Sequence, residues 1–168
     1  MSILENLYER LQIIDGDPCH GGENAVKQVT ETSPIPLPQD YLEFLMEISG
    51  STDNEGDCYG PELGVREPGS AEDEYEASIW IFSAQAALNT YTEYKVDAAP
   101  DYDDIIDKIW IIGNDLGDLL YFYCEGEDGF GIYREEAGSL GIGQAEKIAD
   151  TLTDFLVKGT GIDTAITL

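Results

Sequence analysis

The segment from Lys108 to Glu136 restricts the fold more than any other part of the chain. It contains three runs of strand length, KIWIIGN, DLLYFYCE and GFGIYREE, in which bulky apolar residues dominate or alternate with polar ones. The two joins, NDLG and GEDG, are rich in Asn, Asp and Gly, which tolerate the positive φ angles of tight turns. The segment therefore predicts a three-stranded antiparallel meander.

The acids of this meander have two possible interpretations, a carboxylate site or a set of turn residues. Asp115 and Asp118 occupy or border the first turn, so we interpret them as turn residues first of all. Glu125, Glu127 and Asp128 fit the second turn and would also extend an acidic rim. Sheet with acidic turns is the favoured interpretation.

Two helices are expected before residue 51. Residues 2–14, SILENLYERLQII, carry apolar residues at helical spacing, and Ser2 followed by Glu5 is a capping-box pattern. Residues 33–38, SPIPLP, place proline at every second position, which predicts an extended lead into the next helix. That helix, over residues 38–50, aligns four apolar side chains on one face: Tyr41, Phe44, Leu45 and Ile48.

The middle of the chain is expected to contain less regular structure. Residues 51–78 are dominated by Gly, Pro, Ser and acids, with a short strand possible around Leu63–Val65. SIWIF, residues 78–82, is a short apolar strand, and Ser83 is placed to cap a helix over residues 84–95.

The end of the chain is expected to be helical. Residues 96–107, VDAAPDYDDIID, form an acidic turn that leads into a short helical piece before the meander. Residues 143–161 are predicted to form a closing helix that ends at Gly159. Its apolar face would consist of Ala145, Ile148, Ala149, Leu152, Phe155 and Leu156.

This order of elements predicts an α+β fold, with a mostly antiparallel sheet, a meander in its C-terminal part and flanking helices. The 168 residues suit a single domain over residues 1–168. The sequence is 42% hydrophobic, which is too apolar for a disordered acidic tail.

The net charge of −27, from 35 acids and 8 bases, is far more than a fold requires. Such a surface repels nucleic acid and anionic membranes, so neither is an expected partner. A basic protein partner is favoured, and a high-salt habitat is the competing explanation. Because a symmetric dimer would oppose like charges, a monomer is favoured.

Cysteine usage and the start of the chain both favour the cytoplasm. Cys19, Cys58 and Cys124 are odd in number and widely spaced, which argues against a disulfide framework or a zinc site. The first residues, MSILENLYERLQII, resemble neither a signal peptide nor a membrane span. We therefore expect a reduced, cytoplasmic protein.

Catalytic and metal-binding signals are weak, so we expect no enzyme, no cofactor and no dedicated metal site. The single histidine, His20, lies in a Gly-rich loop beside Cys19, and adjacency in sequence does not create attack geometry. DNEGD, residues 53–57, begins like a calcium loop, but Cys58 and Gly64 occupy the positions that need Gly and Glu. Carboxylate pairs carry little information in so acidic a chain.

Residues 51–107 are the strongest candidate for a binding surface. They hold fifteen acids and only two bases, with tyrosines interleaved. Tyrosine supplies buried area and a hydroxyl, while carboxylates steer a basic partner. The partner-binding residues that we predict are Asp53, Glu55, Asp57, Tyr59, Glu72, Asp73, Glu74, Tyr75, Glu76, Asp97, Asp101, Tyr102, Asp103 and Asp104.

Several segments together resemble the SUKH superfamily, also called Smi/Knr-like. LPQDYLEFLMEISGS is similar to that family's LP-x-x-Y/F-x-x-F/L helix, although ISGS replaces the usual NGG. IWIIGNDLGDLLYFY and GFGIYREE resemble its central strands, and AEKIADTLTDFLVKG resembles its closing helix. The matches run in family order over residues 30–160.

The resemblance implies an α+β domain and a binding role without catalytic residues. Many bacterial members are immunity proteins that neutralise a cognate toxin, often a nuclease, and fungal members are binding proteins too. A nuclease toxin needs a positive cleft for phosphates, which an acidic inhibitor would complement. An immunity protein against a basic toxin is the leading hypothesis. A regulatory adaptor of the same fold and a carboxylate-dependent enzyme or metal protein are the alternatives.

Overall fold

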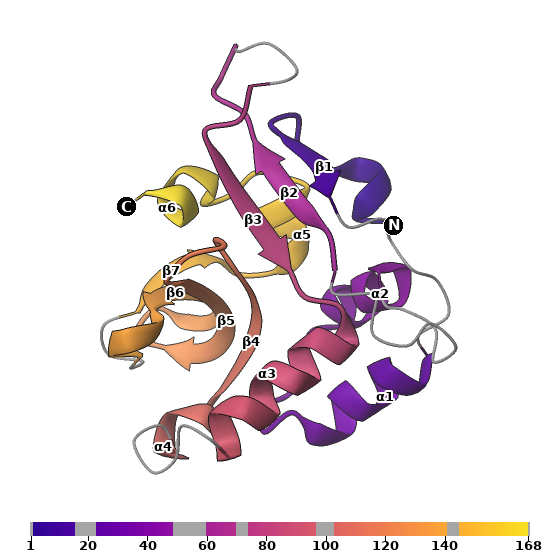
Figure 1. Ribbon diagram of the computed structural model, residues 1–168, viewed down its shortest axis with the longest axis vertical. Coiled ribbons are helices and arrows are strands. Elements are labelled where there is room, and N and C mark those ends of the chain that lie inside the picture. The colour runs from indigo at the N-terminus through magenta and orange to yellow at the C-terminus, as the bar shows by residue number, and fades with distance from the viewer. Residues whose placement is uncertain are drawn as a thin grey trace.

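The structure is a computed structural model and describes residues 2–15, 23–48, 60–69, 74–96, 103–140 and 145–167. Figure 1 shows the elements in space. The N-terminal half contains η1 (Leu4–Asn6), β1 (Leu11–Asp15), α1 (Glu23–Thr32), α2 (Gln39–Ile48), β2 (Glu62–Val65), β3 (Ala77–Ile81) and α3 (Ala84–Val96). The C-terminal half contains α4 (Asp103–Ile106), β4 (Ile109–Asn114), β5 (Leu119–Gly126), β6 (Gly129–Glu136), η2 (Ala137–Ser139), β7 (Glu146–Ala149), α5 (Leu152–Leu156) and α6 (Ile162–Ile166).

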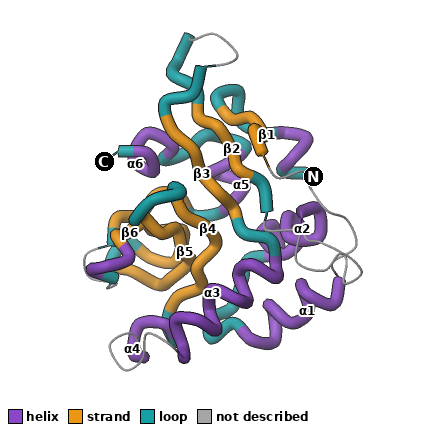
Figure 2. The backbone as a smooth tube through the Cα atoms, in the orientation of Figure 1, coloured by secondary structure: helices purple, strands orange, loops and turns teal. Residues whose placement is uncertain are grey.

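Seven strands form one sheet in the order β1-β2-β3-β4-β5-β6-β7, and every neighbouring pair is antiparallel. Strands β4 to β7 curl strongly, whereas β1 to β3 extend away from the curl (Figures 1 and 2). Helices α1, α2 and α3 pack together beside the sheet, and α6 lies against β3 and β7. The predicted α+β fold with a mostly antiparallel sheet is confirmed.

A group of aromatic side chains joins the sheet to the helices. The indole Nε1 of Trp110 on β4 donates a hydrogen bond of 2.9 Å to the Tyr41 hydroxyl on α2. The Tyr121 hydroxyl donates to the carbonyl oxygen of Ala165 in α6 at 2.9 Å. The Tyr123 hydroxyl accepts a bond of 3.1 Å from the amide of Leu152, at the start of α5. Each of these three hydrogen bonds gives a buried aromatic side chain its polar partner and fixes one helix on the sheet.

Burial changes the acid–base behaviour of these side chains. Desolvation raises the pKa of Tyr41, Tyr121 and Tyr123 well above the ordinary tyrosine value. Desolvation also raises the pKa of the Cys124 thiol to about 12, with Glu125 and Glu135 adding to the shift. Cys124 is therefore a buried, protonated thiol at neutral pH.

Several sequence predictions are confirmed by these elements. Helix α2 buries Tyr41, Phe44, Leu45 and Ile48, as its spacing indicates. Strands β2 and β3 cover the two predicted short strands, and the meander forms as β4, β5 and β6. The Ser83 hydroxyl accepts a hydrogen bond of 3.2 Å from the amide of Ala86 at the start of α3, so the predicted cap is present.

The helix predicted over residues 2–14 is wrong. Only one 3₁₀ turn forms there, with the Ser2 hydroxyl accepting from the amide of Glu5 at 3.2 Å, and the chain then enters β1. The physical reason is that β1 gains a backbone ladder with β2, from Leu11 opposite Val65 to Asp15 opposite Glu62, with one register shift between Ile13 and Asp15. Tertiary pairing of this kind overrides a weak local helix preference.

The single closing helix predicted over residues 143–161 is also wrong. Residues Glu146–Ala149 form β7, which pairs with β6, and Thr151 then begins α5 by accepting a side-chain hydrogen bond from the amide of Asp154. The outer side of β6 needs a strand partner for its backbone groups, and β7 supplies it. The apolar residues of the predicted face are buried all the same: Ile148, Ala149, Leu152, Phe155 and Leu156.

The β4–β5 turn holds an exposed leucine in an unfavourable backbone conformation. Leu116 has φ of +66° and is 54% exposed. The Asn114 side chain accepts from the amide of Leu116 at 2.9 Å, and Asp115 accepts from the amides of Gly117 and Leu119. These bonds hold the turn in spite of the cost of a left-handed leucine, which is about 1–2 kcal/mol.

Replacing this leucine with asparagine is expected to stabilise the protein. Asn tolerates the left-handed region far better than Leu, so Leu116→Asn should raise the free energy of unfolding by about 1 kcal/mol. Urea denaturation followed by circular dichroism measures the change. Leu116→Ala is the control, because it removes the apolar bulk but keeps the strained β-carbon, and a comparable gain from alanine would contradict this account of the turn.

Candidate functional site: an acidic surface around strands β1 to β3

An open acidic pocket lies at one end of the β2–β3 pair. Four residues line an open pocket of about 210 Å³: Glu67, which follows β2, and Glu74, Tyr75 and Glu76, which precede β3. The backbone amide of Glu76 donates to the carbonyl of Val65 at 2.8 Å, which continues the ladder into the pocket. Three carboxylates are thus placed around one tyrosine by strand pairing.

Tyr75 is fixed in position by a glycine on the neighbouring strand. A β-carbon at Gly64 would lie 2.5 Å from Cδ1 of Tyr75, so only glycine leaves room for the ring. The Tyr75 hydroxyl also donates to the side-chain oxygen of Gln12 on β1 at 3.2 Å, and Arg66 donates to the same oxygen. The aromatic ring of the pocket is therefore held rigidly on the sheet.

Glu76 of this pocket has a buried cationic partner. The guanidinium of Arg10 is 3.6 Å from Glu76 and 2.9 Å from Asp163 of α6, and its Nε donates to the carbonyl of Arg66 at 2.6 Å. Arg10 itself is only 8% exposed. Because this arginine links the pocket to α6, Glu76 has a structural role in addition to any binding role.

The chain carries 35 acids and only 8 lysine and arginine residues, so its carboxylates far outnumber the cations. All 8 lysine and arginine residues lie within the described ranges. Glu62 and Glu74 form no ion pair with any of them. Among the described residues, ion pairs with lysine or arginine are formed by these acids: Glu31, Glu76, Asp107, Glu146, Asp150, Asp154 and Asp163.

The structure brings together three of the predicted binding residues, Glu74, Tyr75 and Glu76. Asp103 and Asp104 form the first turn of α4. The remaining predicted residues lie outside the described residues: Asp53, Glu55, Asp57, Tyr59, Glu72, Asp73, Asp97, Asp101 and Tyr102.

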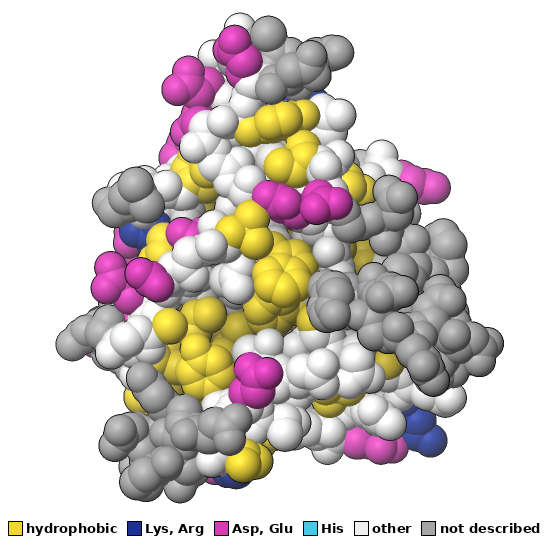
Figure 3. Space-filling view, viewed as in Figure 1, with side chains coloured by type: hydrophobic (Ala, Val, Ile, Leu, Met, Phe, Trp, Pro, Cys, Tyr) yellow, Lys and Arg dark blue, Asp and Glu magenta, His cyan; other side chains and the backbone are white. Residues whose placement is uncertain are grey.

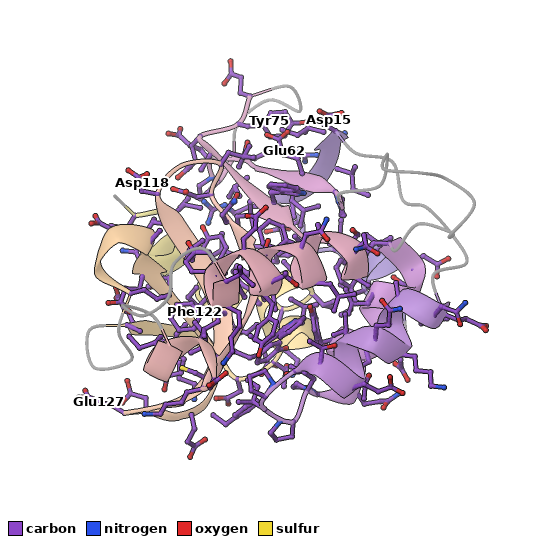
Figure 4. The ribbon with its side chains drawn as sticks, turned by 60° about the horizontal axis from the view of Figure 1, so that its bottom comes forward. Asp15, Glu62, Tyr75, Asp118, Phe122 and Glu127 are labelled. Atoms are coloured by element: carbon purple, nitrogen blue, oxygen red, sulfur yellow. The ribbon has the colours of Figure 1, made fainter. Side chains whose placement is uncertain are left out.

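Sequence reasoning missed a row of side chains that crosses the sheet. Asp15 lies opposite Glu62, Glu62 lies opposite Trp80, and Trp80 lies opposite Asn114. Figure 4 shows Asp15, Glu62 and Tyr75 close together at one end of the molecule. The sequence feature that could have revealed this row is the alternation of side chains along β3. Ile79 and Ile81 are fully buried, so Trp80 between them must face outwards.

Figure 3 shows how side-chain types are distributed on the face that carries β3 and α3. Hydrophobic side chains gather over the middle of this face, and acidic side chains lie beside and above them. Within the described ranges, no group of three or more His, Cys, Asp or Glu is arranged to hold a metal ion. An apolar centre with an acidic surround suits the binding of a basic, partly apolar surface.

The comparisons with known proteins agree with the fold. The model of the SMI1 / KNR4 family (SUKH-1) matches residues 22–158, and the chain belongs to this family. A search of curated proteins finds no significant match.

The family assignment supports a role of the toxin-immunity type at the level of the family, which is known for immunity or binding proteins. None of the helices in the described ranges is both long and apolar enough to cross a membrane.

Proposed function

We propose that this protein is an immunity protein that acts in the cytoplasm and neutralises a basic toxin domain by binding it through its acidic surface. The observation that carries the proposal is the pocket around Tyr75, where the three glutamates Glu67, Glu74 and Glu76 line the same hollow as an aromatic ring held on the sheet. Family membership supports a binding role of this type. A toxin that cuts nucleic acid carries a positive cleft, and this surface complements it.

The large net charge suits an inhibitor that has to act quickly. Electrostatic steering raises association rates to about 10⁸–10⁹ M⁻¹s⁻¹ at low salt. Residues 51–107 hold fifteen of the 35 acids, so the steering field is concentrated on one stretch of the chain. We infer that the partner is held across the β2–β3 end, where it would cover its own active site or substrate entrance.

The first test identifies the partner by a pull-down from the source cells. The bait is the full chain, the salt concentration is varied, and mass spectrometry identifies what is retained. A basic toxin domain retained at low salt and weakened at high salt is the expected result, because the Debye length falls from about 10 Å at 0.1 M to about 3 Å at 1 M. Recovery of abundant basic proteins alone would contradict the proposal.

The second test locates the interface with charge reversals. The variant Glu67→Lys/Glu74→Lys is expected to slow association with the recovered partner at least about tenfold at low salt, as measured by stopped-flow or surface plasmon resonance. Glu125→Lys/Glu127→Lys is the matched control. It changes the net charge equally, but it lies at the β5–β6 turn, far from Tyr75 in the view of Figure 4. Equal slowing by both variants would mean that the pocket is not the interface.

A further inference from the structure

We propose that the outer face of β1 to β3 holds an arginine side chain of the bound protein, stacked on the Trp80 indole and paired with the Glu62 carboxylate. This inference rests on the proposed function, because it assumes a basic protein partner. It assigns a chemical role to two residues outside the pocket, Glu62 and Trp80.

Strand register places the two groups side by side. Glu62 of β2 is the direct cross-strand partner of Trp80 on β3. Residues that are directly opposite in an antiparallel pair share one face of the sheet, with β-carbons about 4.5–5.5 Å apart. Asp15 of β1 lies opposite Glu62 on its other side, so a second carboxylate lies one strand further from the indole.

Trp80 is held in a fixed orientation although it lies on the outer face. Its Nε1 donates to the carbonyl of Gly60 at 3.2 Å, and its ring packs edge-to-face on Phe82 with centroids 4.7 Å apart. The other tryptophan, Trp110, is 1% exposed, whereas Trp80 is half-buried. A fixed and partly exposed indole is the form of tryptophan that anchors protein interfaces.

Arginine is the side chain that matches both groups at once. A guanidinium stacks flat on an indole through cation–π attraction and can also donate two parallel hydrogen bonds to a carboxylate. A lysine ammonium is a compact charge that is more strongly hydrated, so it gains less from the ring. Within the described ranges, Glu62 forms no ion pair with any lysine or arginine of this chain, so its charge is available to a partner's cation.

The test uses two probes of equal charge, a hexa-arginine peptide and a hexa-lysine peptide. Each is titrated into the full ¹⁵N-labelled chain at fixed salt, and the tryptophan indole resonances are followed by NMR. The two indole signals are assigned with Trp80→Phe. We expect hexa-arginine to shift the Trp80 indole signal, to leave the buried Trp110 signal in place, and to bind about fivefold more tightly than hexa-lysine.

Matched variants separate the specific site from general charge attraction. Glu62→Gln is expected to abolish most of the preference for arginine, and Trp80→Phe to reduce it while keeping a ring against Phe82. Glu127→Gln removes the same charge at the far turn and should leave the preference intact. Equal binding of the two peptides, or an equal effect of Glu62→Gln and Glu127→Gln, would overturn the arginine site.

The outcome is distinguishable from that of the proposed function. Failure to recover a basic toxin would remove the immunity role but would not change the peptide result. Loss of the arginine preference would remove this site and leave an inhibitor that binds through the Tyr75 pocket.

Discussion

Raising the pH from 10 to 11 is expected to lower the free energy of unfolding by about 4 kcal/mol. Tyr41, Tyr121 and Tyr123 are fully buried, and desolvation raises their pKa values far above that of an exposed tyrosine. The native state therefore keeps these protons, whereas the unfolded chain loses them above about pH 10. Their contribution to stability is complete below that pH and is lost as the pH rises towards the native pKa values.

The Cys124 thiol adds to the same effect. Its pKa is about 12 in the native protein, against an ordinary value of 9.0. Between these two pH values the unfolded chain loses the thiol proton while the native protein keeps it, so the free energy of unfolding falls as the pH rises. Each buried group contributes about 1 kcal/mol between pH 10 and pH 11. A protein of ordinary stability, about 5–15 kcal/mol, would unfold within one or two further pH units.

Two optical signals measured together check this prediction. Far-ultraviolet circular dichroism follows unfolding, and absorbance of tyrosinate follows ionisation; the two should change together for the buried tyrosines. Tyr121→Phe is the cleanest variant, because the Ala165 carbonyl keeps a bond from Arg134. Removal of this one group should reduce the pH dependence by about a quarter. Ionisation of all 10 tyrosines with retained circular dichroism would contradict the prediction.

A methyl group at Gly161 is expected to destabilise the protein by about 3 kcal/mol. Gly161 begins α6 with φ of +76°, where a side chain is disfavoured by about 1–2 kcal/mol. In addition, a β-carbon there would overlap the backbone carbonyl oxygen of Ile148 in β7. Neither the added β-carbon nor the Ile148 carbonyl oxygen is at the end of a flexible side chain. The overlap can therefore be removed only if α6 moves away from the sheet.

Two other glycines distinguish the cost of the positive φ from the cost of the overlap with Ile148. Gly69 has nearly the same φ, +79°, but a β-carbon there would meet nothing within 4 Å, so Gly69→Ala should cost only about 1 kcal/mol. Gly138 has open space and does not have a positive φ, so Gly138→Ala should change stability by less than about 0.5 kcal/mol. Urea midpoints of the three variants give the comparison. Equal losses at Gly161 and Gly69 would show that packing against Ile148 is unimportant.

The elements that sequence alone predicted share one property, which is that local pattern and tertiary role agree. Helix α2 has four apolar residues on one face and ends before Gly50. The meander has strand-length runs with Asn, Asp and Gly between them. At such positions local preference and packing give the same answer.

The elements that were missed show the limits of local pattern. The spacing of apolar residues in 2–14 fits a helix, yet Leu11 and Ile13 are needed as strand residues beside β2. Likewise, Ile148 and Ala149 fit a helical face but complete the ladder of β6. Helix α1 was not predicted at all, although Ala25, Val26 and Val29 form a short buried stripe. In the first case the deciding contact is with a strand far away in the sequence, and in the second it is with the preceding strand β6.

The candidate site also has one part that the sequence predicted and one part that it did not. Composition pointed to Glu74, Tyr75 and Glu76, and the structure places them around one pocket. The row through Glu62 and Trp80 depends on cross-strand register, which joins residues eighteen positions apart and cannot be read from composition. The partial exposure of Trp80 follows from the phase of β3, in which Ile79 and Ile81 face the core. Both faces of β4 are buried, so Trp110 is covered whichever face it lies on.

The strict chain order of the seven strands has a consequence for how the molecule comes into being. Each new strand adds to an edge that the preceding strand has already provided, so no strand has to wait for a partner from the far end of the chain. Growth of the sheet can therefore keep pace with the ribosome, with β7, α5 and α6 completing the core last. The immunity role that we propose requires an inhibitor that is ready before its target becomes active, and a fold that is finished almost as soon as it is made would serve that role.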